Sequence, residues 1–234
     1  MMEKISIGWQ KQPAKLNIQG EIERAIKDIT GEDVDLIASG RTDAGVHALG
    51  QVANFKTDSN IPIEKFPIAL NTKLKRSIRI LEAEEVDERF HSRYNCKKKT
   101  YRYVINNSEN GTAIYRNLEY NFSQKLDVEK MSEAAKYFIG EHDFKSFTKN
   151  HKLENTVRTI YDINFEIENN VIKINFIGNG FLHNMVRIIV AMLIEVGNGR
   201  FSIEYLQEAM ENKNRKYAPK LAPSNGLYLM EVSY

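Results

Sequence analysis

The stretch S-G-R-T-D-A-G-V-H-A-L-G-Q, from Ser39 to Gln51, governs the interpretation of this chain. An apolar run, residues 34–38, precedes it, and a strand-like run, residues 51–55, follows it. Three glycines punctuate it, and glycine permits positive φ or the close approach of another group. Asp43 stands beside the cation Arg41, and a polar loop between strands is a common place for chemistry. Asp-Ala-Gly is also good turn chemistry, and the pattern alone favours a structural turn.

The composition is that of an ordinary soluble globular protein. The chain has 234 residues, 42% of them hydrophobic and 27% charged, which suits one large or two small domains. No run approaches the ~20 apolar residues of a membrane span, and residues 1–9 lack an apolar core of signal-peptide length. Cys96 is the single cysteine. This excludes an intrachain disulfide and a cysteine-based metal site, and it predicts a reducing, cytoplasmic environment.

A basic stretch follows in the middle of the chain, although the net charge is only +2. Residues 89–102 hold six Lys or Arg, one His and no acid, with Phe90, Tyr94 and Tyr101 interleaved. Cations neutralise phosphates and aromatic rings stack on unpaired bases, a combination that suits single-stranded or looped RNA. The alternative is a solvated basic strand at a sheet edge, where lysines prevent edge-to-edge pairing.

Apolar periodicity predicts a mixture of helices and strands. The expected helices are residues 17–31, 62–74, 128–139 and 185–196, and the expected strands are 34–38, 51–55, 78–83, 100–105, 163–167, 172–176 and 227–232. Asn169-Asn170 predicts a hairpin turn, and residues 140–149 are expected to form a loop. Because the elements do not alternate regularly, we expect an α+β fold with antiparallel sheet and helices on one face. A division near residues 89–96 gives an N-terminal half, 1–95, and a C-terminal half, 96–234.

Four segments together resemble the tRNA pseudouridine synthase A family. They are G-W-Q-K-Q (Gly8–Gln12), S-G-R-T-D-A-G-V-H-A-L-G-Q-V (Ser39–Val52), F-H-S-R-Y with K-K-K-T-Y-R-Y (Phe90–Tyr103) and G-N-G-F-L-H-N-M-V-R (Gly178–Arg187). Weaker support comes from G-E-H-D-F-K-S-F (Gly140–Phe147) and G-L-Y-L-M-E-V (Gly226–Val232). The segments occur in the family's order and span nearly the whole chain.

The resemblance implies a pseudouridine synthase fold. Two similar α+β halves would join their antiparallel sheets side by side, with an RNA cleft between the halves. It implies a homodimer that grips one tRNA and converts uridine to pseudouridine at positions 38–40 of the anticodon arm, without metal or organic cofactor. Two alternatives remain: a catalytically weak tRNA-binding or chaperone relative, and a synthase that acts on another RNA.

The resemblance also assigns catalytic roles. The reaction breaks the bond between C1′ and N1 of uridine and joins C1′ to C5. Asp43 matches the family's catalytic aspartate, which either attacks C1′ or removes the 2′ proton. Arg187 would pair with Asp43 and keep it ionised; the alternative is an arginine that reaches the helix surface. Tyr101 would stack on the target base, whereas Tyr103, on the same strand face, is expected in the core.

Further residues are expected to hold the RNA or the fold. Arg41 would fill the space of the flipped-out uridine or hold its phosphate. The side chains expected to meet phosphates are Arg93, Lys97, Lys98 and Lys99. His47 and His183 are expected to be structural or to contact backbone.

The N-terminus departs from the family pattern. Members usually begin with a strand that ends in a Tyr-Asp-Gly turn before the G-W-Q segment, but only residues 1–7 precede Gly8 and no such turn occurs. A missing central strand leaves unpaired backbone groups and an open edge. We therefore expect either a start upstream of Met1 or a form with reduced stability.

Overall fold

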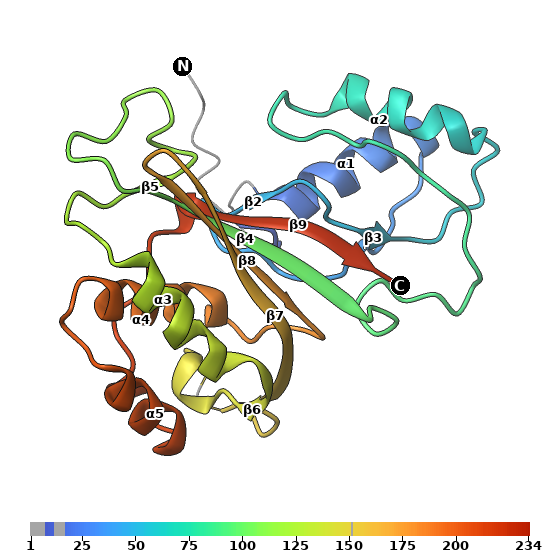
Figure 1. The fold of residues 1–234 in the computed structure, drawn as a ribbon. Coiled ribbons are helices and arrows are strands. Elements are labelled where there is room, and N and C mark those ends of the chain that lie inside the picture. The colour runs from blue at the N-terminus through green and yellow to red at the C-terminus, as the bar shows by residue number, and fades with distance from the viewer. Residues whose placement is uncertain (1–7, 12–16, 151) are drawn as a thin grey trace. The chain divides into compact units, whose positions relative to one another are not determined.

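The computed structural model describes residues 8–11, 17–150 and 152–234 (Figure 1). The chain folds into two compact units. The first contains the chain up to Gly45 together with Gln51–Cys96, and the second contains Val46–Gly50 together with Lys97–Tyr234. The first strand expected from the family pattern falls on residues 1–7, outside the described residues.

The first helix of the first unit begins and ends where the sequence predicts. Helix α1 spans Ile18–Thr30. The side chain of Asn17 caps its start by accepting a hydrogen bond of 2.8 Å from the Gly20 N–H, as short polar residues do at N-caps. Gly31 ends the helix with φ of 80°, a left-handed conformation that glycine adopts without strain.

The rest of the first unit contains little regular sheet. Strands β1 (Ile37–Ala38) and β3 (Ala53–Asn54) pair antiparallel, so both predicted strands form but are short. The 3-10 turn η1 (Ile63–Lys65) leads into α2 (Phe66–Lys73). The apolar core gathers one side of α1 and α2 with the segments around them: Trp9, Ile22, Ala25, Ile26, Leu36, Phe66, Leu70, Leu74 and Ile78.

The predicted strand at residues 78–83 is wrong, because these residues form no ladder in the described part of the chain. A side chain takes up the backbone groups of Ile80 instead. Asn71 accepts from the Ile80 N–H at 2.9 Å and donates to the Ile80 carbonyl at 2.8 Å. Leu81 is 76% exposed, so the apolar run does not continue into the core.

The second unit is built on one seven-stranded sheet with the order β2-β9-β4-β8-β7-β6, in which β5 also pairs with β4. The strands are β2 (His47–Ala48), β4 (Lys98–Asn106), β5 (Tyr120–Asn121), β6 (Gly140–Asp143), β7 (Val157–Glu168), β8 (Val171–Gly178) and β9 (Leu227–Ser233). Only the β2–β9 and β4–β5 pairs are parallel among the described strands. The β7–β8 hairpin turns where predicted, with Asn169 at φ of 53°.

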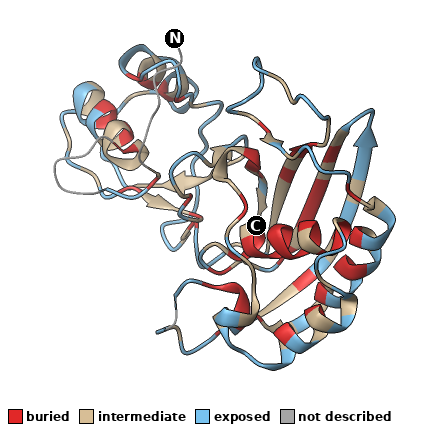
Figure 2. Ribbon diagram, turned by 90° about the vertical axis from the view of Figure 1, so that its left-hand side faces the viewer, coloured by how far each residue is buried: buried red, intermediate tan, exposed pale blue. Residues whose placement is uncertain are grey.

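Helices cover one face of this sheet (Figure 1). They are α3 (Val128–Ala135), η2 (Lys136–Phe138), η3 (Lys145–Phe147), α4 (Met185–Gly197), α5 (Ile203–Glu211), η4 (Arg215–Tyr217) and η5 (Ser224–Gly226). Helix α4 is buried along nearly its whole length. Buried residues also occur along the strands of the sheet (Figure 2). The predicted α+β class is confirmed.

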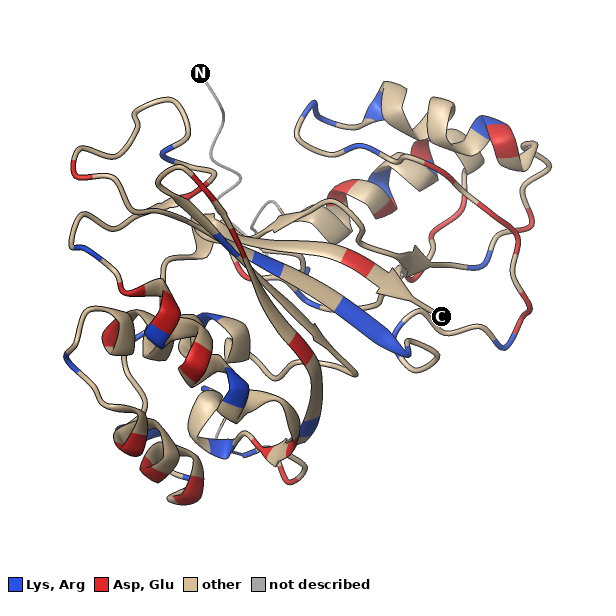
Figure 3. Cartoon of the chain, viewed as in Figure 1, with Lys and Arg blue, Asp and Glu red and all other residues tan. Residues whose placement is uncertain are grey.

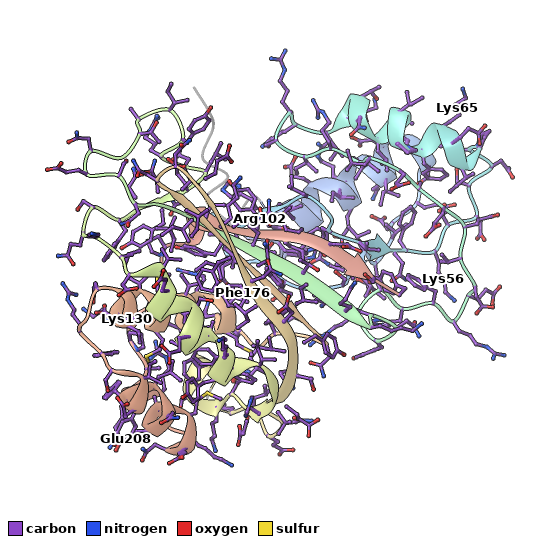
Figure 4. The ribbon with its side chains drawn as sticks, viewed as in Figure 1. Lys56, Lys65, Arg102, Lys130, Phe176 and Glu208 are labelled. Atoms are coloured by element: carbon purple, nitrogen blue, oxygen red, sulfur yellow. The ribbon has the colours of Figure 1, made fainter. Side chains whose placement is uncertain are left out.

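The two faces of the sheet differ in chemistry, as alternation along strands requires. Phe176 on β8 is fully buried in the core below the helices. Its neighbour Asn175 and the opposing Arg102 belong to the other face (Figure 4). There Arg102 donates to Asn175 and to Glu166, each at 2.8 Å.

Two further elements were missed or misread from the sequence. Residues 140–149, expected as a loop, contain strand β6 and the 3-10 turn η3, whose Phe147 is fully buried. Helix α5 was not predicted, although Ser202 caps it by accepting from the Tyr205 N–H at 3.3 Å. No helix among the described residues has the length and apolar character needed to cross a membrane.

Candidate active site

The neck of the Ser39–Gln51 loop is closed by a side chain. The Gln51 amide donates to the Gly40 carbonyl at 2.9 Å and accepts from the Ser39 hydroxyl at 2.7 Å. The Ser39 N–H donates to the Val52 carbonyl at 2.8 Å. These three bonds bring the loop's two stems together directly above the β1–β3 pair, so the loop starts from a fixed base.

Asp43 lies in a tight turn that Gly8 and Trp9 support. The Trp9 N–H donates to the Thr42 carbonyl at 3.0 Å, and the Trp9 side chain is buried in the unit's core. A Cβ atom on Gly8 would lie 2.3 Å from the same carbonyl oxygen, so only glycine allows this approach. Gly45 completes the turn with φ of 80°. Asp43 therefore forms part of a turn and is still partly exposed to solvent. A structural role in the turn does not exclude a catalytic role for its carboxylate.

Beyond Gly45 the loop belongs to the second unit. Strand β2 pairs parallel with β9, and a Cβ atom on Gly50 would lie 2.3 Å from the Met230 carbonyl. The His47 ring stacks on Tyr228 with centroids 4.6 Å apart. Its Nε2 lies 2.9 Å from the Asn117 carbonyl and 3.2 Å from the Asn225 carbonyl. The predicted structural role of His47 is confirmed.

The two tyrosines of β4 have different environments. Tyr103 is fully buried and donates its hydroxyl to the Pro223 carbonyl at 2.7 Å. Burial raises the pKa of Tyr103 far above its ordinary value, because the charged phenolate would lose its hydration. Its prediction as a core residue is confirmed. Tyr101 keeps part of its surface accessible and meets the ring of Phe181 edge to face, with centroids 5.3 Å apart.

Arg187 occupies the first turn of α4 and is partly buried. Its Nε–H donates to the Ala222 carbonyl at 2.7 Å, and its own carbonyl accepts from the Ala222 N–H at 3.2 Å. The first bond orients the guanidinium, and the second holds the segment before β9 against the helix backbone. The expected pairing of Arg187 with Asp43 joins residues of different units and stays a prediction.

The basic stretch divides at the unit boundary. Before it, a short turn runs from His91 to Asn95, in which the N–H groups of Arg93 and Tyr94 donate to His91 Nδ1 at 3.1 and 3.2 Å. Ser92 in this turn is fully buried. It donates its hydroxyl to the Ile37 carbonyl at 2.6 Å and its N–H to the Asn54 side chain at 2.9 Å. Ser92 thereby joins the turn to both strands that carry the loop.

The other part of the basic stretch leads into the interior of a sheet. Strand β4 pairs with β8 on one side and with β9 on the other, from Lys98 or Lys99 onward. The alternative of a solvated edge strand is therefore wrong. Arg41, Arg93 and Lys97 are exposed and Lys98 and Lys99 are half-buried, while His183, also exposed, accepts at its backbone carbonyl from Lys149 and Thr148.

The predicted site residues thus fall into two groups, one in each unit. The first unit holds Arg41, Asp43 and Arg93, and the second holds Lys97, Lys98, Lys99, Tyr101 and Arg187. Sequence reasoning missed the supports: Gln51, Ser92 and Phe181. All three lie within the motifs that resemble the family, so membership of a motif was the sequence feature that could have identified them as supporting residues. Across the described residues, no group of three His, Cys, Asp or Glu side chains could hold a metal ion.

Comparison with known proteins identifies the family of this chain. A family model described as tRNA pseudouridine synthase matches residues 6–95 and 134–234, parts of both units. The chain is 50% identical to tRNA pseudouridine synthase A of Acetivibrio thermocellus and 51% identical to that of Caldicellulosiruptor saccharolyticus. It is 50% identical to tRNA pseudouridine synthase A 2 of Clostridium perfringens. Each alignment covers 97% of this chain and 93% of the relative. The chain therefore belongs to the tRNA pseudouridine synthase family.

Proposed function

We propose that this protein isomerises uridine to pseudouridine at positions 38–40 in the anticodon arm of tRNA. The observation that carries the proposal is the intact R-T-D-A-G-V-H loop, held at its neck by Gln51 and supported by Gly8 and Trp9 in a chain of this family. Such a loop presents a carboxylate from a fixed backbone, and fixed geometry is what makes a positioned group an efficient catalyst.

Asp43 is the reacting group in this proposal. Its carboxylate either attacks C1′ while the bond to N1 breaks, or removes the 2′ proton to release the base. The uracil then turns and C5 bonds to C1′. On the first route this displaces the Asp43 carboxylate from C1′, and on the second the carboxyl group returns its proton to C2′. The proton on C5 then leaves to a base, and N1 takes up a proton. Atoms balance without an oxidant or net hydrolysis, so the proposal needs no metal or organic cofactor.

Arg187 keeps Asp43 ionised, and Tyr101 stacks on the target uracil. Asp43 stands three residues before Val46, where the chain enters the unit that contains both partners, which supports this assignment. The contact of Arg187 with Ala222 orients its guanidinium. Phe181 supports the Tyr101 ring at its edge, and the Tyr101 hydroxyl can assist proton removal at C5.

Cations outside the reacting group hold the RNA. Arg41 fills the space of the flipped-out uridine or holds its phosphate, because it is exposed two residues before Asp43. The proposed phosphate contacts are Arg93, Lys97, Lys98 and Lys99. The functional form is a cytoplasmic homodimer with its RNA cleft between an N-terminal half, 1–95, and a C-terminal half, 96–234; the family resemblance supports these points.

Release of tritium from C5-labelled uridine in tRNA tests the proposal. We expect release by the wild-type protein, and a loss of at least about 10²–10⁴-fold in Asp43→Asn, the range for removal of a positioned acid–base group. Binding of tRNA by Asp43→Asn should stay close to that of the wild type. Binding without release by the wild type would instead indicate a tRNA-binding relative without synthase activity. Normal turnover in Asp43→Asn would remove this residue from the mechanism.

A further inference from the structure

A second group of cations lies on the first unit, outside the motif segments quoted in the sequence analysis. The turn after α2 carries Lys73, Lys75, Arg76 and Arg79, and we call these four residues the basic turn. All four are exposed. The chain contains no acid between Lys65 and Leu81, so the positive charge of the turn is not interrupted along the sequence.

The backbone of the basic turn is firmly held. The Ile78 N–H donates to the Lys75 carbonyl at 3.0 Å, and Leu74 and Ile78 are buried in the unit's core. Arg24 of α1 donates to the Lys73 carbonyl at 3.2 Å, while Asn71 of α2 holds Ile80 just beyond the turn. The exposed cations therefore extend from a backbone that needs little further ordering when a ligand binds.

Nearby acids neutralise the turn only weakly. Lys75 Nζ is exposed and lies 3.8 Å from the partly buried Glu21, which also accepts from Arg24 at 3.4 Å. A long contact that Glu21 shares with a second cation neutralises Lys75 only weakly. Five acids occupy residues 82–88, but in Figure 3 this acidic segment runs away from the turn, toward the end of α2 that is farther from the turn. Lys65 lies at the other end of α2 (Figure 4).

A surface of this kind suits a polyanion. Lysines and arginines that contact phosphates bind nucleic acid without reading its sequence. The turn's hydrogen bonds lead to α1 and α2, whereas the Asp43 loop is built on β1, β3 and Trp9. Both surfaces pack on the same apolar core, which contains Trp9, Leu74 and Ile78, but their backbones are held by different hydrogen bonds. We propose that the basic turn binds backbone phosphates of the tRNA outside the anticodon arm; this inference rests on the proposed function.

The test compares full-length tRNA with an isolated anticodon stem-loop as substrates. In the triple variant Lys73→Ala, Lys75→Ala and Arg76→Ala, we expect Kd for full-length tRNA to rise roughly five- to a hundredfold, the range for three exposed ionic contacts. The slope of log Kd against log salt should fall by up to ~0.7–0.9 per lost contact. Kd and tritium release for the stem-loop should stay at wild-type values, which also shows that the variant is folded. Arg79 is left in place because its side chain bonds the turn's own carbonyls.

Three controls sharpen the test. Lys73→Arg, Lys75→Arg and Arg76→Lys together preserve the charge and should restore binding of full-length tRNA. Lys125→Ala, Lys130→Ala and Lys136→Ala remove equal charge from an exposed surface of the second unit and should leave both substrates unaffected (Lys130 is labelled in Figure 4). Alanine at Lys97, Lys98 and Lys99 should weaken the binding of full-length tRNA and of the stem-loop by the same factor.

Either of two results would overturn the inference. One is an unchanged Kd and salt slope for full-length tRNA in the triple variant at residues 73, 75 and 76. The other is an equal loss for the stem-loop, which would place the turn on the anticodon arm. Failure of the wild-type protein to release tritium from either substrate would contradict the proposed function itself. This outcome differs from failure of the inference, because it would be seen in the wild-type protein before any residue is substituted.

Discussion

The two units of this protein are held together in different ways. In the second unit, β4 pairs with β8 from Lys99 to Asn106 and with β9 from Lys98 to Tyr103. The fully buried Phe176 and the helix α4 belong to one continuous core. Among the described residues of the first unit the sheet consists of two-residue strands, and single polar side chains, Gln51, Asn71 and Ser92, bond the backbone. Over residues 8–11, 17–45 and 51–96, the unit that carries Asp43 thus has fewer cooperative backbone bonds than the second unit.

The largest expected consequence is a difference in local opening. Amides in short, singly paired segments exchange through small openings, whereas amides in the interior of a sheet exchange only when much of the structure opens. We expect hydrogen exchange at β1 and β3 to be on the order of a hundredfold or more faster than at Tyr103 and Ile105 in β4, a difference of about 3 kcal/mol. Mass spectrometry of exchanged peptides measures this directly. Equal protection in both regions would refute the comparison.

Two buried serines allow the comparison to be tested with one kind of substitution. Ser92 of the first unit and Ser146 of the second are both fully buried. The Ser92 hydroxyl bonds the Ile37 carbonyl, but the Ser146 hydroxyl has no hydrogen-bond partner among the described residues. We expect Ser92→Ala to lower the free energy of unfolding by about 0.5–1.5 kcal/mol, because it removes the hydrogen bond to the partly buried Ile37 carbonyl.

Ser146→Ala is the matched control. It removes a buried hydroxyl without breaking a bond, so we expect its effect on stability to be near zero or favourable. Urea denaturation of both variants measures the two values. A loss in Ser146→Ala as large as that in Ser92→Ala would show that the polar contacts of the first unit have no special weight.

Elements with local signals could be predicted from the sequence. Asn17 and Gly31 bracket α1 because capping depends on a few adjacent residues. Asn169 predicts the β7–β8 turn for the same reason, since the hairpin conformation is chosen within the turn itself. The apolar residues of α4 predict its burial without knowledge of its neighbours.

Elements that depend on distant partners could not be predicted in this way. Residues 78–83 alternate like a strand, but Asn71 takes the backbone groups of Ile80. Strand β6 forms because β7 pairs with it, a contact that no local pattern reveals. The transfer of Val46–Gly50 into the second unit depends on the Leu229 carbonyl, which accepts from the Leu49 N–H at 2.8 Å.

The candidate site shows the same limit. Family resemblance supplied Asp43, Tyr101 and Arg187 as residues, but not what holds them. The edge contact of Phe181 with Tyr101 and the bond from Arg187 to Ala222 join positions 80 and 35 residues apart. Such contacts follow from the fold, so sequence spacing does not reveal them.

The smallest expected effect concerns Asp143, on β6 of the second unit. Its carboxylate accepts from the Thr156 hydroxyl and lies 3.1 Å from Lys213 Nζ just after α5. Partial burial on its own would raise the pKa of Asp143. The hydrogen bonds from Thr156, Lys213 and the Lys145 N–H outweigh it and hold the pKa below its ordinary value. In the second unit too, therefore, a single polar side chain joins separate segments: Asp143 links β6 to Thr156, just before β7, and to Lys213, just after α5.

A carboxylate whose pKa is lower in the folded state binds its proton more weakly there than in the unfolded chain. Its stabilising contribution is complete above the unfolded pKa of about 3.9 and is lost as the pH falls through the folded pKa. We expect Asp143→Asn to reduce the free energy of unfolding by roughly 0.5–1 kcal/mol at pH 7, a small value because its charged partner Lys213 is exposed to solvent. The deficit should be constant between about pH 7 and 5 and should shrink below about pH 4. Urea denaturation across this range measures the deficit, with Glu141→Gln, an exposed carboxylate on the same strand, as control. A deficit that grows as the pH falls would have the wrong sign for a carboxylate held in its charged form.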